Sequence, residues 1–478
     1  MELPFSELAG PRSLSLGGFA PRSGRRRLKR VFFSGLFAVT LAVSATWPSS
    51  GSVQAAPAAT PTFNKDVLPL LQKQCQECHR PNSIAPMSFM TYKDTRPYAR
   101  AIEKAVVGRT MPPWFADPTV GHFKNTKLLT DAEIEVISAW AKNGAPEGDP
   151  KDKPAPVQFA EGWTIGEPDI IVQFPKEIQL PATGVIDQSN LVVRARFERD
   201  MWVKAAEVKP GNARVVHHMK AIIRPPNSTW LANVPEGELY VPQRGEGADR
   251  AVPQPSASGP LPVQDILAKY NPGVEGQEFT VGNAAKFIAA GSDIVFEIHY
   301  TTTGKPETDR SMVGIVLADG PPPVRHLTVT GTNNGNIDIP PGEPNYEIRG
   351  DATLASDAKL VWVQPHQHYR GRYFEMHVVY PNGERKMVLR VPNYRFDWQV
   401  GYELAEPIDL PKGTRIETLG RYDNSAANKF NPDPTARVRF GLQSNDEMHV
   451  AFMGVLVDAK ADPTKIFVRR QRPAPPAQ

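Results

Sequence analysis

The chain has 478 residues, enough for about three domains, and its 22% charged and 40% hydrophobic residues are typical of folded globular proteins rather than disordered ones. Pro is frequent, at 48 residues, which favours short strands and rigid turns because Pro fits neither helix interiors nor central strands. Of the formal net charge of +4, residues 1–55 contribute +5 (seven basic and two acidic residues), so the remainder carries −1 and predicts no nucleic-acid partner.

Residues 1–56 are predicted to be a secretory signal peptide. A basic run, Arg25–Arg30, precedes the mostly apolar segment Val31–Ala45, and a small-residue cleavage site follows at Val53–Ala55. The apolar segment is short for a membrane span, which needs about 20 residues. We therefore expect a periplasmic or otherwise exported protein with no membrane span after cleavage. An uncleaved signal that tethers the protein to the membrane is the alternative, and a translation start downstream of Met1 stays open.

Residues 60–148 are predicted to form a small all-α domain. Apolar residues recur at helical spacing in Phe63–Gln74 and again around Tyr98–Val106. A third helix is expected to begin at Thr130–Glu133, which has the pattern of a capping box, and to end at Asn143–Gly144.

A haem-attachment motif, Cys75-Gln76-Glu77-Cys78-His79, follows the first predicted helix. In such a motif the two thiols add to the haem vinyl groups and the histidine supplies the proximal imidazole. A zinc site would need a second ligand pair at suitable spacing nearby, and the sequence has none. We therefore predict covalent haem c on Cys75, Cys78 and His79, so that the α domain is a c-type cytochrome.

A methionine is the expected sixth ligand, because a thioether raises the reduction potential and suits electron transfer. The candidates are Met87, Met90 and Met111. We favour Met111, because the prolines of Pro112-Pro113-Trp114 fix the backbone and the Trp can pack against the porphyrin. Core packing or loop filling explains the other two.

Residues 149–160 are predicted to be a linker, since Glu147–Pro156 is rich in Pro and Lys. Beyond it, short β-branched runs alternate with turns, as in antiparallel sandwiches. Gly320–Pro323 divides this region into residues 161–320 and 321–460, each of sandwich size. The predicted fold is thus a small all-α cytochrome c domain followed by two antiparallel, jelly-roll-like β-sandwiches, with residues 461–478 as a tail.

Several histidines lie in or beside these strands. His366 and His368, at spacing i, i+2, project from one face of a strand and can reach one metal ion. His217 and His218 would point to opposite faces of a regular strand, so they can share an ion only if the chain bulges or twists there. Two further histidines stand alone in predicted strands and are interpreted as structural: His326 and His377.

Four stretches, in this order, resemble the ligand motifs of the copper type II, ascorbate-dependent monooxygenases, which include peptidylglycine α-hydroxylating monooxygenase and dopamine β-monooxygenase. The stretches are Val216–Met219, Glu297–Tyr300, Pro365–Arg372 and Ser444–Met448. The resemblance spans roughly residues 165–458 and implies two β-sandwiches that each hold one copper and face each other across an open cleft.

The resemblance also implies roles for six residues. It assigns the electron-transfer copper to His217, His218 and His299. It assigns the copper that binds O2 and leads hydrogen abstraction to His366, His368 and Met448. Imidazole suits both copper oxidation states and a thioether favours Cu(I), in agreement with this division. His449 stands where the animal enzymes have Cys; it could be an extra ligand, although the neighbour of a strand residue normally faces away.

These observations predict an exported haem–copper monooxygenase that hydroxylates an unidentified small organic substrate with O2. Its electrons would come through the fused cytochrome from a redox protein or a small reductant. The alternative is a non-catalytic periplasmic electron-transfer or copper-binding protein. A blue-copper or multicopper oxidase is disfavoured, because a blue site needs a Cys thiolate and both cysteines belong to the haem motif.

Overall fold

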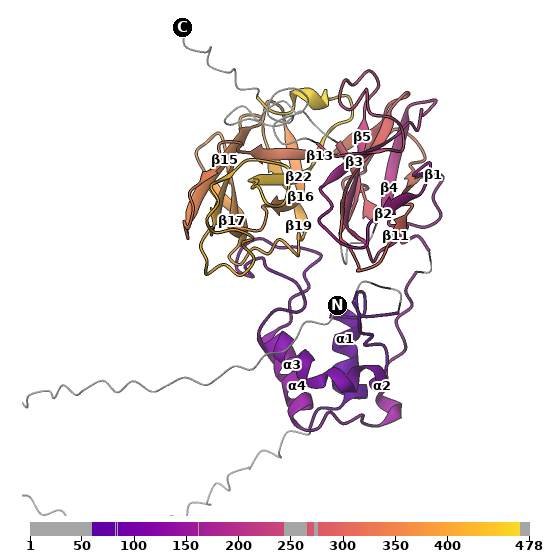
Figure 1. The fold of residues 1–478 in the computed structure, drawn as a ribbon, viewed down its shortest axis with the longest axis vertical. Helices are drawn as coiled ribbons and strands as arrows, with labels where there is room; N and C mark the ends of the chain where they lie inside the picture. Colours follow the sequence, from indigo (N-terminus) through magenta and orange to yellow (C-terminus); the bar gives the residue numbers. More distant parts are fainter. Residues whose placement is uncertain are drawn as a thin grey trace, which may run out of the picture. The chain divides into compact units, whose positions relative to one another are not determined.

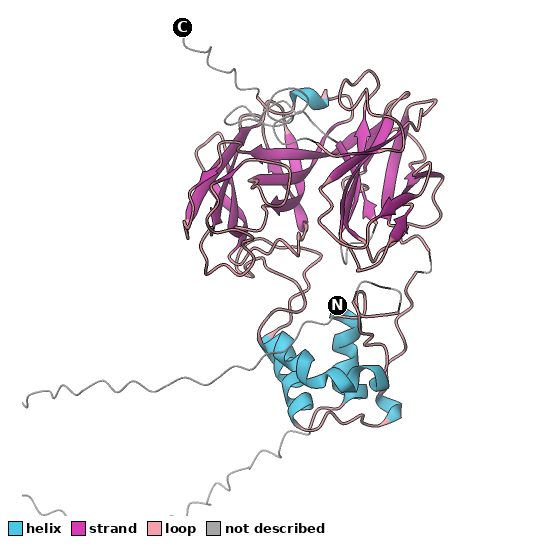
Figure 2. Ribbon diagram, viewed as in Figure 1, coloured by secondary structure: helices cyan, strands magenta, loops and turns pink. Residues whose placement is uncertain are grey.

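The computed structural model describes residues 60–468, apart from 82, 84, 161, 243–264 and 272–275. The predicted signal peptide, residues 1–56, and the end of the predicted tail lie outside the described residues. Within them most of the regular secondary structure is β-strand, and the few helices are concentrated before the first strand (Figures 1 and 2). No helix in this part of the chain is long and apolar enough to cross a membrane.

The helical region contains the three helices that the sequence predicts. The elements are a π-helical turn (Phe63–Val67), α1 (Leu68–Gln74), α2 (Tyr92–Thr95), a 3-10 turn (Arg96–Tyr98), α3 (Ala99–Val107) and α4 (Asp131–Lys142). The capping box at the start of α4 is present, because Thr130 Oγ1 accepts from the Glu133 amide while the Glu133 carboxylate accepts from the Thr130 amide. The helices share one apolar core, in which Phe63, Ile137 and Trp140 are fully buried.

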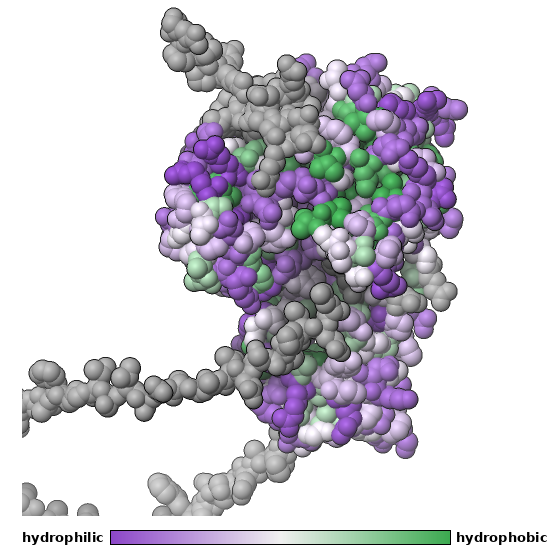
Figure 3. All heavy atoms as spheres, in the orientation of Figure 1, coloured by the Kyte–Doolittle hydropathy of each residue, from purple (hydrophilic) through white to green (hydrophobic). Residues whose placement is uncertain are grey.

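The first half of the β region packs two sheets against each other. One sheet has the order β1 (Ile170–Gln173), β12 (Met312–Leu317), β4 (Met201–Lys209), β9 (Ala284–Ile288), with β8 (Gln277–Glu278) beside β4. The other has the order β6 (Leu239–Tyr240), β3 (Ser189–Val193), β10 (Asp293–Tyr300), β5 (Val216–Arg224), β7 (Asp265–Tyr270). A short pair, β2 (Ile178–Leu180) and β11 (Glu307–Asp309), lies beside them. Figure 3 shows hydrophobic residues gathered on the surface of this first sandwich.

The second half repeats this arrangement. One sheet has the order β13 (Val324–Asn333), β22 (Val450–Asp458), β16 (Ala358–His366), β19 (Tyr402–Leu410). The facing sheet has the order β15 (Tyr346–Thr353), β20 (Arg415–Tyr422), β17 (Gly371–Val379), β18 (Arg385–Val391). A short pair, β14 (Asp338–Ile339) and β21 (Val438–Arg439), and two 3-10 turns, Pro150–Asp152 and Pro463–Lys465, complete the described elements. The β-sandwich part of the predicted fold is therefore correct in outline.

The two sandwiches are joined through their backbones. β13 pairs in parallel with β9, so one sheet of each sandwich belongs to a single nine-stranded sheet. Beside this junction the fully buried ammonium of Lys286 pairs with the carboxylate of Asp265. A buried charge is tolerated only when it is paired, so this contact helps to fix the junction.

The segment that follows α3 packs against the second sandwich. Trp114 is only 8% exposed and its ring meets that of Tyr402 edge-on, with centroids 5.1 Å apart. Asp117 forms an ion pair with Arg390 on β18, with a distance of 2.6 Å. The expectation that Trp114 packs against a porphyrin is therefore wrong, because the aromatic core of the second sandwich takes up this side chain.

Trp114→Ala should lower the free energy of unfolding of the second sandwich by about 3 kcal/mol, because it leaves a large cavity in that core. Urea unfolding followed by far-ultraviolet circular dichroism measures the change. Tyr98→Ala, at a 39% exposed aromatic residue of the helical region, is the matched control and should have little effect. A haem absorption spectrum altered by Trp114→Ala, with stability unchanged, would contradict the placement.

Candidate metal centres

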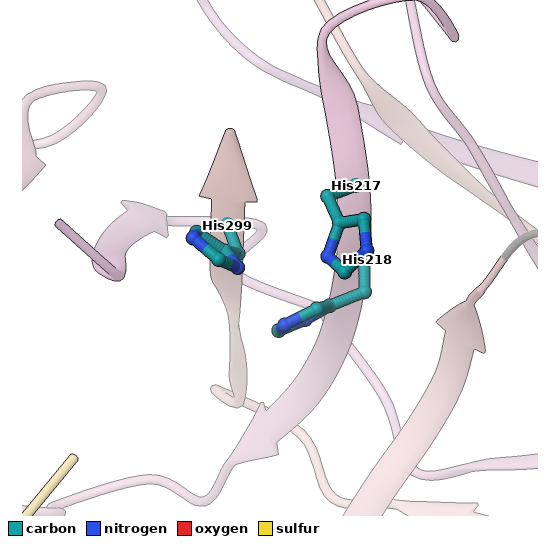
Figure 4. A group of neighbouring side chains, drawn as sticks. All are labelled: His217, His218 and His299. Carbon is teal, nitrogen blue, oxygen red and sulfur yellow. The ribbon is translucent and has the colours of Figure 1, made fainter. Parts of the chain in front are cut away.

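A β-bulge brings His217, His218 and His299 together. β5 and β10 are antiparallel, with His299 opposite His218 but Tyr300 opposite Val216, so that His217 is the extra residue in the ladder. At a bulge two residues oppose one on the partner strand, which lets neighbouring side chains turn towards the same space. Figure 4 shows the three rings converging from the two strands. The condition that the sequence sets for His217 and His218 to share an ion is therefore met.

The three imidazoles form a compact group. One nitrogen of each lies within 4.8 Å of one nitrogen of each of the others, and the rings of His217 and His299 are close to perpendicular, at 86°. Burial lowers the pKa of all three, that of His299 to about 4, and the neighbouring imidazoles lower the pKa of His218 and His299 further. Near neutral pH the rings are therefore uncharged, which is the form that binds metal ions.

Two buried nitrogens of this group lack a protein partner. Neither His217 Nδ1 nor His299 Nδ1 has a hydrogen-bond partner among the described residues, although both atoms are buried. Leaving such a nitrogen unpaired costs about 1–3 kcal/mol. A metal ion bound between the rings would offset this cost, so the donor set fits a first-row transition metal that prefers imidazole.

A second pair of histidines lies at the end of β16 in the other sandwich. The rings of His366 and His368 are 5.1 Å apart at an angle of 85°, and both residues are buried. His366 Nδ1 lies 2.7 Å from the side-chain oxygen of Gln399, and His368 Nδ1 lies 3.1 Å from the carbonyl oxygen of Asp446. These acceptors place the proton of each ring on Nδ1, so both Nε2 atoms are free to bind a metal.

Glu447 ties the third expected ligand to this pair. Its carboxylate accepts hydrogen bonds from the amides of His368 (2.8 Å), Arg370 (2.7 Å) and Met448 (3.3 Å). β16 and β22 pair up to His366 opposite Val450, and Met448 lies two residues before this end of β22. Burial raises the pKa of Glu447 to about 8. The sequence includes Glu447 in the Ser444–Met448 motif but gives it no role.

His449 belongs to the core of the second sandwich instead. It is fully buried, with Nε2 3.0 Å from Thr418 Oγ1 and Nδ1 3.1 Å from the hydroxyl of Tyr422. Both ring nitrogens are thus engaged, and the neighbouring strand residue faces away as regular strand geometry requires. These contacts leave neither ring nitrogen of His449 free to bind a metal ion.

Phe396 lies between the two groups of histidines. Its ring centroid is 6.3 Å from that of His217 and 5.9 Å from that of His368. A positive charge on His299 would lower the pKa of His368, so the two groups are close enough to sense each other's charge. The resemblance implies an open cleft at this place, whereas here an aromatic ring stands between the groups. Phe396 and Gln399 lie in a loop without a motif, so sequence reasoning missed both.

The CxxCH segment forms a tight turn at the end of α1. The amides of Cys78 and His79 both donate to the carbonyl oxygen of Cys75, at 3.2 and 2.9 Å. Cys75 and Cys78 are not joined to each other by a disulfide. Burial, together with Cys78, raises the pKa of Cys75 to about 12, so this cysteine carries its proton at neutral pH.

His79 is oriented by the loop that follows. Its Nδ1 lies 3.2 Å from the carbonyl oxygen of Met87, and its ring stacks on that of Phe89 with centroids 4.2 Å apart. Because the carbonyl oxygen can only accept, this hydrogen bond places the proton of the neutral ring on Nδ1 and leaves the lone pair on Nε2. Met87 packs against the helical core, Met90 donates its amide to Ser88, and Met111 is half-buried just beyond α3.

The two other strand histidines lie apart from these groups. His326 packs against Phe279, with centroids 5.1 Å apart, and His377 lies 3.8 Å from the carboxylate of Glu375.

Comparisons with known proteins assign no family. No protein-family model and no curated protein matches the chain. Among solved structures, it is similar to PNGase F, a glycosylasparaginase from Flavobacterium meningosepticum, with 7% identity, a TM-score of 0.24, and coverage of 60% of this chain and 97% of that one. A second similar structure is that of infectious bursal disease virus, Gx strain, with 8% identity, a TM-score of 0.17, and coverage of 63% and 75%. Scores this low support no conclusion about this chain.

Glu447→Gln should lower the free energy of unfolding by about 2 kcal/mol, since one of the two oxygens that accept hydrogen bonds from three amides becomes an NH2 group that cannot accept. It should also weaken copper binding at His366 and His368 by about tenfold, because the backbone that carries His368 is no longer held. Urea unfolding and competition with a copper chelator measure the two effects. Glu406→Gln, at an exposed residue of β19, is the control, and equal effects in both variants would contradict the role of Glu447.

Proposed function

We propose that this chain is an exported haem–copper monooxygenase. It hydroxylates a small organic substrate with O2, using electrons that arrive through a c-type cytochrome domain formed by its helical region. The observation that carries the proposal is the convergence of His217, His218 and His299 on one space, which the bulge between β5 and β10 produces. Two of these three neighbouring neutral imidazoles have buried nitrogens without a hydrogen-bond partner among the described residues. Without a bound ion, these nitrogens destabilise the fold, so a purely structural role does not explain the group.

Haem c fits the helical region. The turn at the end of α1 brings both cysteines close to His79. The Met87 carbonyl oxygen accepts a hydrogen bond from Nδ1 of His79, which leaves Nε2 as the nitrogen that would hold the iron. The backbone of Met87 lies at Nδ1 of His79, and Phe89 stacks on the same imidazole. Met111, just beyond α3, would be the second residue that holds the iron. The haem would supply one-electron transfer at a potential raised by the thioether.

Copper fits the two groups of histidines. His217, His218 and His299 would hold the electron-transfer copper, and His366, His368 and Met448 the copper that reacts with O2. Copper supplies one-electron redox chemistry and O2 binding in its Cu(I) state, which a thioether favours. The overall reaction balances as R–H + O2 + 2 e⁻ + 2 H⁺ → R–OH + H2O.

The chain's own residues prepare these centres. Burial keeps the imidazoles neutral, so metal binding at neutral pH needs no proton release from them. Gln399 and Asp446 fix which nitrogen of His366 and His368 faces the ion, which removes an orientational cost from binding. The ring of Phe396 is buried and lies near both groups, with its centroid 6.3 Å from that of His217 and 5.9 Å from that of His368.

Two connections hold the helical region to the β region. The linker packs back on the helices, with Gln72 donating to the carbonyl oxygen of Ala155 at 2.8 Å and Arg80 lying 4.3 Å from the ring centroid of Phe159. The segment from Trp114 to Asn125 binds the second sandwich, where Asn125 donates to the carbonyl oxygen of Gly401 at 2.8 Å. A donor held in this way has a high effective concentration, about millimolar for a flexible tether, which favours delivery of electrons from haem to copper.

Metal analysis of the mature protein should give about two copper ions for each haem, because the two ligand groups lie on different sandwiches. His217→Ala and His366→Ala should each remove one ion. His377→Ala, at a strand histidine outside both groups, is the matched control and should retain both. Loss of both ions from either single variant would show that the sites are not separate.

Stopped-flow mixing of the fully reduced protein with O2 tests the proposed division of roles. His299→Ala should slow oxidation of the haem, because the first copper no longer relays electrons. Met448→Ala should stop substrate hydroxylation but still permit transfer from haem to copper.

Haem oxidation at the same rate in wild-type and copper-free protein would contradict electron exchange between the two regions. Copper-dependent haem oxidation without hydroxylation of any compound in a broad substrate screen would instead favour the non-catalytic electron carrier.

A further inference from the structure

A cavity of about 300 Å³ lies between the two sandwiches, apart from both groups of histidines. Its walls come from β7, β13 and β16 and from the segment around β8, so both sandwiches contribute. The residues that matter to its chemistry are Lys269, Trp362, His326, Phe279 and Val361. The lining also includes Lys124, which forms an ion pair with Glu403 at 2.8 Å, and the exposed Glu278. Its size and its mixture of apolar walls with a few polar groups are typical of small-molecule sites.

Lys269 is a buried amine without a carboxylate partner among the described residues. It is 8% exposed; its Nζ donates to the side-chain oxygen of Gln364 at 2.7 Å and lies 3.9 Å from the ring centroid of Trp362. The buried Lys286, by contrast, pairs directly with Asp265. Burial lowers the pKa of Lys269 well below its usual value, and the more distant Glu403 only partly opposes this effect. A bound anion would provide the missing counter-charge.

His326 adds a second unpaired group to the same wall. It is 7% exposed, and its Nδ1 is buried without a hydrogen-bond partner among the described residues. The neighbouring ring of Phe279 satisfies no polar atom. An amine without a counter-ion and an imidazole without a partner on one small cavity point to a ligand with an oxygen anion.

We propose that this cavity binds a small organic carboxylate. The carboxylate pairs with Lys269 beside the imidazole of His326, while the apolar body of the ligand lies among Phe279, Val361 and Trp362. Because Lys124 is paired with Glu403, Lys269 is the amine left to match one carboxylate charge. The apolar walls match an aromatic or short aliphatic acid rather than a free phosphate.

Hydrogen bonds connect this cavity to the second group of histidines. Lys269 bonds to the side-chain oxygen of Gln364, and the amide nitrogen of Gln364 donates to the carbonyl oxygen of Gln399. The side-chain oxygen of Gln399 in turn accepts from His366. A ligand that draws Lys269 away from Gln364 would therefore shift the partner that orients His366. This consequence rests on the proposed copper function, whereas the carboxylate site itself does not.

Calorimetric titration of copper-free protein with benzoate and hexanoate tests the site, and benzamide is the uncharged control ligand. Benzoate or hexanoate should bind, and benzamide at least about tenfold more weakly, because it lacks the charge that Lys269 recognises. Lys269→Met should weaken binding of the acid by about tenfold or more, and Lys269→Arg should retain part of it. Lys359→Met, at an exposed lysine of β16, is the matched control and should bind as the wild type does.

Val361→Phe keeps Lys269 but fills the cavity, so it should also abolish binding of the acids. If Lys269→Met does not fold, Val361→Phe alone tests whether the acids bind in this cavity. The proposal is overturned if neither acid binds, or if Lys269→Met or Val361→Phe binds them as tightly as the wild type. Electron paramagnetic resonance of the copper-loaded protein tests the connection separately: benzoate should change the spectrum of the copper at His366. Binding without such a change removes the connection and leaves the carboxylate site in place.

Discussion

One extra residue in the ladder between β5 and β10 determines whether this chain can bind a metal through three histidines. In a regular strand the side chains of His217 and His218 would point to opposite faces of the sheet, so only one of them could face His299. The bulge between His299 and Tyr300 turns both towards the partner strand, where His299 completes the group. The rest of the first sandwich serves to hold that register, because a slip of one residue would reverse every side chain.

The second group depends on side-chain hydrogen bonds rather than on a bulge. The i, i+2 spacing already places His366 and His368 on one face, so what is left to fix is the rotation of each ring. Gln399 from a loop and the carbonyl oxygen of Asp446 fix that rotation, and Glu447 holds the backbone beneath. The two groups are thus built by different means on similar sandwiches, which is consistent with different tasks.

Sequence periodicity predicted the features that depend on local geometry. The capping box at Thr130 and the strands of the sandwiches follow from short-range rules, and so does the expectation that His449 faces away from Met448. The bulge was stated only as a condition, since no single residue there demands it. Trp114 was misplaced because its partner Tyr402 is remote in sequence, and Phe396 and Gln399 were missed because their loop has neither period nor motif.

The closeness of the two groups sets an electrostatic requirement. Imidazoles on either side of Phe396 lower each other's pKa, so cations bound at both places would also repel one another. In the first group the net pKa of both His217 and His299 is lowered by burial, but the carboxylates of Asp397 and Asp187 oppose this shift. These two carboxylates would therefore partly neutralise positive charge in the first group. Burial and the ammonium of Lys220 lower the pKa of His366 in the second group, and the carboxylate of Glu297, 2.6 Å from that ammonium, partly neutralises its charge.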